Sequence, residues 1–354
     1  MPDVEFYATT DNWPEFTTST DMPSLRARMI NTLLRLTVKP LWRPGLTVDA
    51  IRRHTARTDA RLGRRRVDCA TEPTTIAGVP AQWYGAPDLA ERNGTLLYLH
   101  GGAWCVHLPG MYGAFAARLS AATGMRVLLV DYRLAPEHRF PAAVDDCLAV
   151  YRALVAGPTG RPRVIAGDSA GGNLSLVTLM QARDAQLPLP ACAVLLSPAT
   201  DISMSGPSIR YNAKADPMFS AGAGDLLPEL YGPGLERTLP LISPLHGNWS
   251  GLPPLYFLAG STEMLLDDSV RAHDRAQQAG TSSRIDVWPD LPHVFPLFPQ
   301  LPEAKQAIRD IVTFIEEHAR NVAALPQSAE PQASLDQALT SGFAAAEPAN
   351  RESL

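Results

Sequence analysis

The feature that most constrains the fold is an alternation of short apolar segments with helical patterns, which is clear from Thr95 onward. Strands are expected at Leu96–Leu99, Arg126–Val130, Arg163–Ala166, Cys192–Leu196, Pro254–Ala259 and Arg284–Trp288. Helices are expected at 111–123, 142–155, 266–279 and 302–320, and another is expected from Asn173. Continuously apolar strands alternating with helices are typical of a parallel sheet covered on both faces. We therefore predict an α/β fold with a doubly wound, mostly parallel sheet.

Two further helices and one further strand are expected before this alternation begins. Apolar residues recur at helical spacing within Pro23–Leu36, and a second helix is expected over Val48–Leu62. Thr75–Tyr84 resembles a first strand. A different break in the rhythm lies at about 201–250, where Pro, Gly and Ser are frequent. We interpret that stretch as an insertion at the functional edge of the sheet.

Composition excludes several classes of protein. A net charge of -5 and a pI near 5.9 argue against a nucleic-acid partner. The arginine-rich stretch at 52–66 is interpreted as a solvated helix face rather than a membrane or polyanion patch. No apolar run is long enough for stable membrane insertion, and no secretory signal is apparent, so a cytoplasmic protein is expected. The four cysteines lack metal or disulfide spacing and are expected in the core.

The segment Gly167–Gly172, with sequence Gly-Asp-Ser-Ala-Gly-Gly, lies where an expected strand meets an expected helix. A serine flanked by glycines at such a junction indicates a nucleophile elbow, because the sharp turn strains the serine and exposes its hydroxyl at a helix N-terminus. The alternative is an ordinary Ser/Gly turn without chemistry. If the elbow forms, Ser169 is the nucleophile and it needs a base, an acid and oxyanion donors at the same sheet edge.

His293 is the candidate base, because it follows the last expected strand by five residues and so lies at the carboxyl edge of the sheet. The candidate acids Glu263, Asp267 and Asp268 follow the preceding strand. Glu263 is favoured because it is closest to the strand end, whereas helix capping explains the aspartates. Asp267 stays open as the alternative. The acid would hold the imidazole in the required tautomer.

A loop after the strand Leu96–Leu99 is the candidate oxyanion hole. Its sequence, His100-Gly101-Gly102-Ala103-Trp104, contains two glycines that let the backbone approach a substrate without a Cβ in the way. We predict that the N–H groups of Gly101, Gly102 and Ala170 bind the oxyanion. His100 is interpreted as an organiser of the loop. A plain Gly-Gly turn is the alternative.

These residues together resemble the hormone-sensitive-lipase family of α/β-hydrolases, the bacterial group with a Gly-Asp-Ser-Ala-Gly elbow. The resemblance covers about residues 75 to 320 and includes His100-Gly101-Gly102, Asp131–Glu137 and Phe140–Ala143. Two positions depart from the family pattern: Ala103 replaces a third glycine, and Glu263-Met264-Leu265 stands where Asp-Pro-Leu is common. The resemblance implies an α/β-hydrolase fold with a helical cap and a serine carboxylesterase acting on short- to medium-chain acyl esters.

The domain organisation follows from the resemblance and the irregular regions. We predict N-terminal cap helices at 1–70, a catalytic domain at 71–324 with the cap insertion at about 201–250, and a disordered tail at 325–354. Trp104, Met218 and Phe219 are predicted to line the substrate pocket. The predicted partner is a small acyl ester, no metal or cofactor is expected, and a homodimer stays open. Amide or lactone hydrolysis, or a non-catalytic small-molecule receptor, are the alternative functions.

Overall fold

The computed structural model describes residues 22–42, 47–63, 69–157, 161–220, 222 and 228–322, and the predicted tail at 325–354 lies outside them. Its centre is an eight-stranded sheet in the order β1-β2-β4-β3-β5-β6-β7-β8. Strands β3 to β8 run parallel to one another, whereas β2 pairs antiparallel with both β1 and β4. The predicted mostly parallel, doubly wound sheet is therefore confirmed. The strands are β1 Thr71–Ile76, β2 Val79–Tyr84, β3 Thr95–Leu99, β4 Arg126–Val130, β5 Val164–Asp168, β6 Cys192–Leu196, β7 Leu255–Gly260 and β8 Ser283–Trp288.

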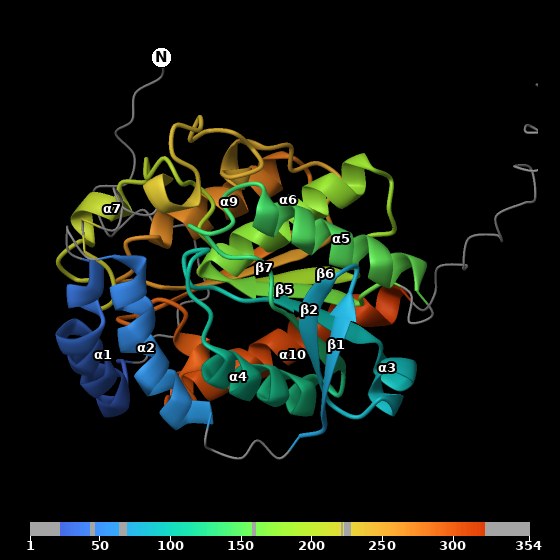
Figure 1. Cartoon of the computed structure of the whole chain (residues 1–354), viewed down its shortest axis with the longest axis horizontal. Coiled ribbons are helices and arrows are strands. Elements are labelled where there is room, and N and C mark those ends of the chain that lie inside the picture. Colours follow the sequence, from blue (N-terminus) through green and yellow to red (C-terminus); the bar gives the residue numbers. More distant parts are fainter. Residues whose placement is uncertain are drawn as a thin grey trace, which may run out of the picture.

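Helices cover both faces of this sheet, with α4 and α10 on one side and α5, α6 and α9 on the other (Figure 1). The helical segments described are α1 Leu25–Thr37, η2 Lys39–Trp42, α2 Val48–Gly63, α3 Asp88–Asn93, α4 Pro109–Thr123, α5 Ala142–Ala156, α6 Ser169–Asp184, α7 Ser208–Tyr211, η3 Pro244–His246, α9 Leu266–Gln278, η4 Phe295–Leu297 and α10 Pro302–Val322. None of the helices in this part of the chain has the length and apolarity needed to cross a bilayer.

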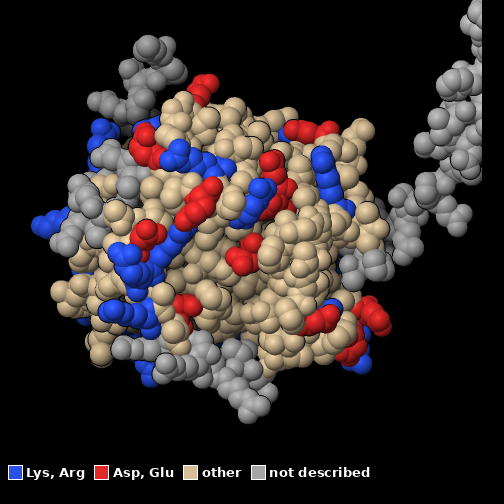
Figure 2. All heavy atoms as spheres, viewed as in Figure 1, with Lys and Arg blue, Asp and Glu red and all other residues tan. Residues whose placement is uncertain are grey.

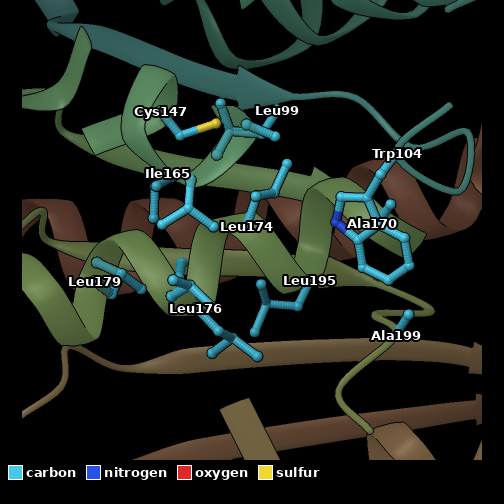
Figure 3. Packing of buried hydrophobic residues seen from close by; sticks show 14 of the residues in the cluster. Leu99, Trp104, Cys147, Ile165, Ala170, Leu174, Leu176, Leu179, Leu195 and Ala199 are labelled. Carbon is cyan, nitrogen blue, oxygen red and sulfur yellow. The ribbon is translucent and has the colours of Figure 1, made fainter. Parts of the chain in front are cut away.

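The core forms two layers because successive side chains of a strand point to opposite faces. In β3, Leu97 and Leu99 pack with residues of α5 and α6, whereas Leu96 and Tyr98 pack with residues of α4 and α10. Figure 3 shows the first layer, in which Ile165 of β5 lies near Leu174 of α6. Burial of both sheet faces explains why these strands are apolar at nearly every position.

The predicted single strand at 75–84 is wrong in its extent. It is a hairpin of β1 and β2, joined by Ala77 and Gly78 at φ 52° and 82°. Two consecutive left-handed residues form the tight turn whose twist matches paired strands. The turn divides the expected strand, and it was not predicted because alanine rarely occupies this backbone region.

The N-terminal segment packs against the segment that follows β6. Lys39 donates hydrogen bonds from Nζ to the carbonyl oxygens of Ala213 and Asp216, at 2.8 and 2.6 Å. The rings of Trp42 and Phe219 lie 5.2 Å apart. We call residues 22–42 and 201–220 the cap segments. Acidic and basic side chains are interspersed over the face of the molecule seen in Figure 2.

Candidate active site

Ser169 lies at a sharp junction between a strand and a helix. Strand β5 ends at Asp168 and α6 begins at Ser169, four residues earlier than the predicted start of the helix. The serine has φ 51°, a left-handed conformation that is strained for a residue with a side chain. A Cβ on Gly171 would lie 1.9 Å from the carbonyl oxygen of Leu99. Glycine is therefore required there, and the junction has the geometry of a nucleophile elbow.

His293 and Glu263 form a buried pair at the ends of β8 and β7. His293 Nδ1 lies 2.8 Å from Glu263 Oε2, and both side chains are almost fully buried. Nε2 of the same ring is buried and has no hydrogen-bond partner among the described residues. The carboxylate is fixed in turn, because Ser197 Oγ donates to its Oε1 at 2.7 Å. The pair can orient an imidazole whose free nitrogen accepts a proton.

The electrostatic surroundings of His293 favour its charged form. Burial lowers the pKa of the ring, but the charge of Glu263 and its hydrogen bond outweigh burial, with smaller contributions from Asp216 and Asp168. The net pKa lies above the ordinary value of 6.5. A nearby carboxylate stabilises the imidazolium that proton abstraction would create, so the raised pKa suits a general base.

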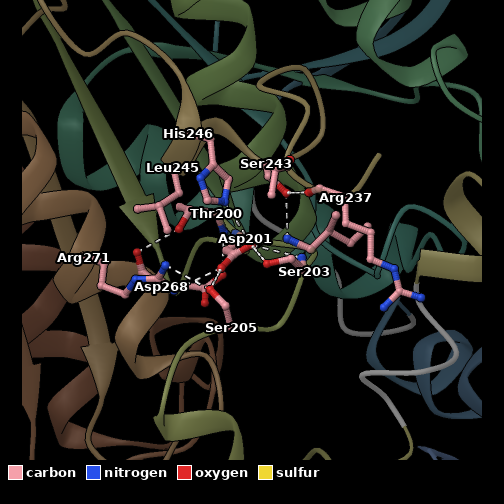
Figure 4. A network of polar contacts seen from close by, with 12 residues as sticks. Thr200, Asp201, Ser203, Ser205, Arg237, Ser243, Leu245, His246, Asp268 and Arg271 are labelled. Carbon is pink, nitrogen blue, oxygen red and sulfur yellow. Dashed lines mark hydrogen bonds and ion pairs between the residues drawn. The ribbon is translucent and has the colours of Figure 1, made fainter. Parts of the chain in front are cut away.

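The two other candidate acids, Asp267 and Asp268, form hydrogen bonds with residues other than His293. Asp267 accepts hydrogen bonds from Ser208 N at 2.6 Å and from the Tyr211 hydroxyl at 3.1 Å, and so ties α9 to α7. Asp268 belongs to a separate polar network that includes Asp201 and Arg271 (Figure 4). Burial and the charge of Asp201 raise the pKa of Asp268 to about 8. Among the three candidate acids, the described structure pairs Glu263 with His293.

The N–H of Gly101, which was predicted to bind the oxyanion, instead anchors the glycine loop after β3 to the nucleophile elbow. Gly101 donates its N–H to Asp168 Oδ1 at 2.9 Å, so this group is already occupied. The N–H groups of Gly102 and Ala103 have no hydrogen-bond partner in the part of the chain that is described. Gly102 has φ 111°, and a Cβ there would lie 1.9 Å from Val106 O. Ala170 is in the first turn of α6, where N–H groups lack helical acceptors.

His100 organises this loop, as its sequence position suggested. Its buried ring stacks between His107 at 4.2 Å and Tyr132 at 4.3 Å, and its Nδ1 lies 2.7 Å from Gly101 O. Asp131 completes a group of potential metal ligands with the two histidines. The histidine rings are almost parallel, at 9°, so their lone pairs lie in parallel planes and do not converge on one ion. We interpret the stack as packing.

Aromatic side chains surround the site residues. Phe219 contacts the ring of His293 edge to face, with centroids 4.9 Å apart, and the adjacent Met218 is partly buried against the same core cluster. Trp104 is 1% exposed and stacks on Tyr231 at 4.5 Å. Figure 3 shows Trp104 beside Ala170. The predicted pocket residues are thus placed near the triad candidates from the loop after β3 and from the cap segments.

Two buried carboxylates near the site were missed by the sequence reasoning. Asp168 accepts from the hydroxyls of Tyr98 and Tyr112 as well as from Gly101 N. Asp216 accepts from the N–H groups of two following residues and from Met264 N at 2.7 Å. The first could have been noticed as a carboxylate next to the serine. The second has local partners in Met218 and Phe219, but its contact with Met264 could not be predicted, because Met264 is distant in sequence.

Comparisons with known proteins show the family to which this chain belongs. A family profile described as alpha/beta hydrolase fold matches residues 96–297. An acetyl-hydrolase of Streptomyces hygroscopicus is 38% identical over 245 residues, which cover 68% of this chain and 81% of that protein. The carboxylesterase/phospholipase LipF of Mycobacterium tuberculosis is 32% identical over 308 residues, covering 83% and 82%.

Solved structures give the same result. An esterase from the bacterial hormone-sensitive lipase family is 37% identical, with a TM-score of 0.76, and the match covers 84% of this chain and all of that one. The esterase EstE5, soaked with p-nitrophenyl butyrate, is 35% identical with a TM-score of 0.75, covering 84% and 99%. The resemblance noted in the sequence is confirmed. This chain belongs to the hormone-sensitive-lipase family of α/β-hydrolases and is a carboxylic ester hydrolase.

Proposed function

We propose that Ser169, His293 and Glu263 are the catalytic triad of this esterase. The buried hydrogen bond between His293 Nδ1 and Glu263 Oε2, which leaves Nε2 without a partner, carries the proposal. The strained Ser169 lies at the same edge of the sheet as Glu263 and His293, because the three residues follow the carboxyl ends of the parallel strands β5, β7 and β8. A serine hydroxyl at the same sheet edge as an imidazole hydrogen-bonded to a carboxylate supplies the three groups that activate a serine.

The proposed reaction proceeds through an acyl-enzyme. His293 Nε2 accepts the proton of Ser169 Oγ while Oγ attacks the ester carbonyl, and the carbonyl oxygen becomes an oxyanion. As the intermediate collapses, the bond to the alcohol oxygen breaks and His293 returns the proton to that oxygen. Water then repeats both steps, and the acid leaves with Ser169 restored. The hydrogen bond from His293 Nδ1 to Glu263 holds the tautomer of the imidazole throughout.

The proposed oxyanion donors are the N–H groups of Gly102, Ala103 and Ala170. Gly102 and Ala103 have no other partner among the described residues, whereas Gly101 is bonded to Asp168. Loss of one such donor costs about a hundredfold or more in kcat.

Ala103→Gly keeps the N–H and suits the left-handed φ of 54°, so activity should be retained. Gly102→Ala meets Val106 O and should abolish turnover.

We propose short- to medium-chain acyl esters as the substrate class. Phe219 packs on the rings of both His293 and Trp42, and Trp104 stacks on Tyr231, so we expect aromatic side chains to limit the room around the acyl group. A series of p-nitrophenyl esters from acetate to palmitate tests this directly. Phe219→Ala should shift the optimum toward longer chains. An unchanged optimum, or a wild-type optimum at palmitate, would contradict the proposal.

Ser169→Ala is the decisive test of the catalytic assignment. Turnover of p-nitrophenyl butyrate should fall by about 10⁴-fold or more, with an unchanged circular dichroism spectrum. Ser175→Ala is the matched control, since Ser175 is a buried serine on the same helix and, among the described residues, its hydroxyl bonds only to Gly171 O. A fluorophosphonate probe should label the wild type and the control but not the Ser169 variant. Equal labelling of all three would refute the assignment.

A cytoplasmic location, the absence of nucleic-acid binding and a homodimer stay predictions from the sequence. Cell fractionation checks the first, and a gel-shift titration checks the second. Light scattering coupled to size exclusion measures the mass of the particle in solution.

A further inference from the structure

Helix α1 presents an apolar stripe to solvent. Leu25, Met29, Leu33 and Leu36 are between 58% and 75% exposed. At about 100° per residue, these four positions fall within about 80° of the helix circumference. The opposite face, which includes Ala27, Asn31 and Leu34, is buried against the protein. The helix is therefore apolar on the side that the fold does not use, and we call these four residues the α1 stripe.

The α1 stripe stands out from the rest of the described surface. Large hydrophobic side chains are otherwise strongly exposed only at Met22, just before the helix, and at Tyr211 in the described ranges. Scattered single apolar residues are normal on a protein surface, but a contiguous row indicates a surface that another phase or molecule covers. The row continues along nearly the whole length of α1, as expected for a helix that lies flat on its partner.

The charges on α1 distinguish between two surfaces that could cover the α1 stripe, a second copy of this chain and a lipid membrane. Helix α1 contains Arg26, Arg28 and Arg35 and no acidic residue. By the same helical geometry, Arg26 flanks the stripe on one side, and Arg28 and Arg35 flank it on the other. A second copy of the chain docked stripe to stripe would bring these cations together without an acidic partner. An anionic lipid surface offers both an apolar interior for the stripe and phosphates for the arginines.

We propose that α1 docks this enzyme peripherally on an anionic lipid surface. The α1 stripe lies in the interface between headgroups and acyl chains, and the arginines contact the headgroup phosphates. The same segment reaches the site, because Arg35 donates to Ala215 O at 2.9 Å and Trp42 packs on Phe219. In Figure 2 the left end of the molecule, where α1 lies, carries basic side chains with acidic ones interspersed. The proposal does not depend on which residues perform catalysis.

Flotation with vesicles tests the proposal on the full-length protein. Vesicles of phosphatidylcholine mixed equally with phosphatidylglycerol are compared with vesicles of phosphatidylcholine alone. Met29→Gln combined with Leu33→Gln removes apolarity at the centre of the stripe, and Met29→Leu combined with Leu33→Met is the matched control. Arg28→Gln removes one flanking charge. Hydrolysis of soluble p-nitrophenyl butyrate is measured for each variant, because none of these side chains contacts the site.

The wild type and the Leu/Met control should float with the mixed vesicles, and binding should weaken at high salt. The double Gln variant should bind about tenfold more weakly or worse, and Arg28→Gln about fivefold more weakly. Activity on the soluble ester should be unchanged. Failure of the wild type to float, or equal binding by the double Gln variant, would overturn the proposal. A wild-type dimer that the double Gln variant separates would assign the stripe to self-association instead.

Discussion

The backbone N–H of Gly101 donates to Oδ1 of Asp168 at 2.9 Å, which fastens the glycine loop to the residue immediately before the nucleophile. Both groups are fully or nearly buried. The bond fixes the distance between two parts of the site that come from different strands, β3 and β5. It also removes Gly101 from the set of free donors, so Asp168 determines which N–H groups face a substrate.

Replacement of Asp168 by Ala should therefore lower kcat without a comparable change in KM. The loop would lose its anchor to the elbow, and a displacement of the oxyanion donors costs about a hundredfold. Steady-state kinetics on p-nitrophenyl butyrate measure this. Tyr98→Phe is the control, because it removes one hydrogen bond to the same carboxylate but leaves the Gly101 bond. A kcat equal to that of the control would contradict the anchoring role.

Glu263→Gln and Asp267→Asn distinguish the two candidate acids. Glutamine cannot hold His293 in the required tautomer, so kcat should fall by about 10³- to 10⁴-fold. Asp267→Asn should change kcat little, because that carboxylate contacts Ser208 and Tyr211 rather than the imidazole. Each substitution replaces one carboxylate with an amide of the same shape. The reverse order of effects would assign the acid to Asp267.

The residues that the sequence could predict are those whose role is set by their place in the chain. A serine between glycines at a strand end, and a histidine just beyond the last strand, follow from parallel topology alone. The choice of Glu263 over Asp267 also followed from distance to the strand end. Gly101 was predicted to donate its N–H to the oxyanion, but in the structure this N–H is bonded to Asp168. Its place in the sequence could not show this, because Asp168 belongs to another strand.

The contacts of residues that follow β6 with the site could not be predicted from the sequence, for a physical reason. Asp216 contacts Met264, and Phe219 contacts His293, across separations that only the packed cap defines. No local propensity or periodicity encodes such contacts. The short helix α3 was missed for a different reason, since six residues between a turn and a strand give too little periodicity to recognise.

The rate of ester hydrolysis should rise with pH, with a midpoint above 6.5. Only the neutral ring of His293 can accept the Ser169 proton, and the surrounding carboxylates raise its pKa above that ordinary value. Asp216→Asn removes one of these negative charges, so the midpoint of kcat/KM should move to lower pH. Asp145→Asn, an exposed aspartate on α5, should leave it unchanged. A shift toward higher pH in the Asp216 variant would contradict the electrostatic argument.

Asp268→Asn should stabilise the protein increasingly as pH rises from about 4 to 8. The pKa of Asp268 is raised from 3.8 to about 8, so in this window the unfolded chain releases a proton that the folded chain retains. Folding stability of the wild type therefore falls as pH rises, and the loss is complete above the folded pKa. An amide oxygen can still accept from the N–H groups of Thr200 and Asp201, which bond to Oδ2.

Thermal unfolding across this pH range measures the effect. The melting temperature of the Asp268→Asn variant minus that of the wild type should grow with pH, and Asp145→Asn, at an exposed position on α5, is measured alongside as a control. Oδ1 of Asp268 is buried without a hydrogen-bond partner among the described residues, so the substitution breaks no bond at that atom. A difference that shrinks toward pH 8 would mean that Asp268 is ionised in the folded protein and that Asp201 does not oppose its charge.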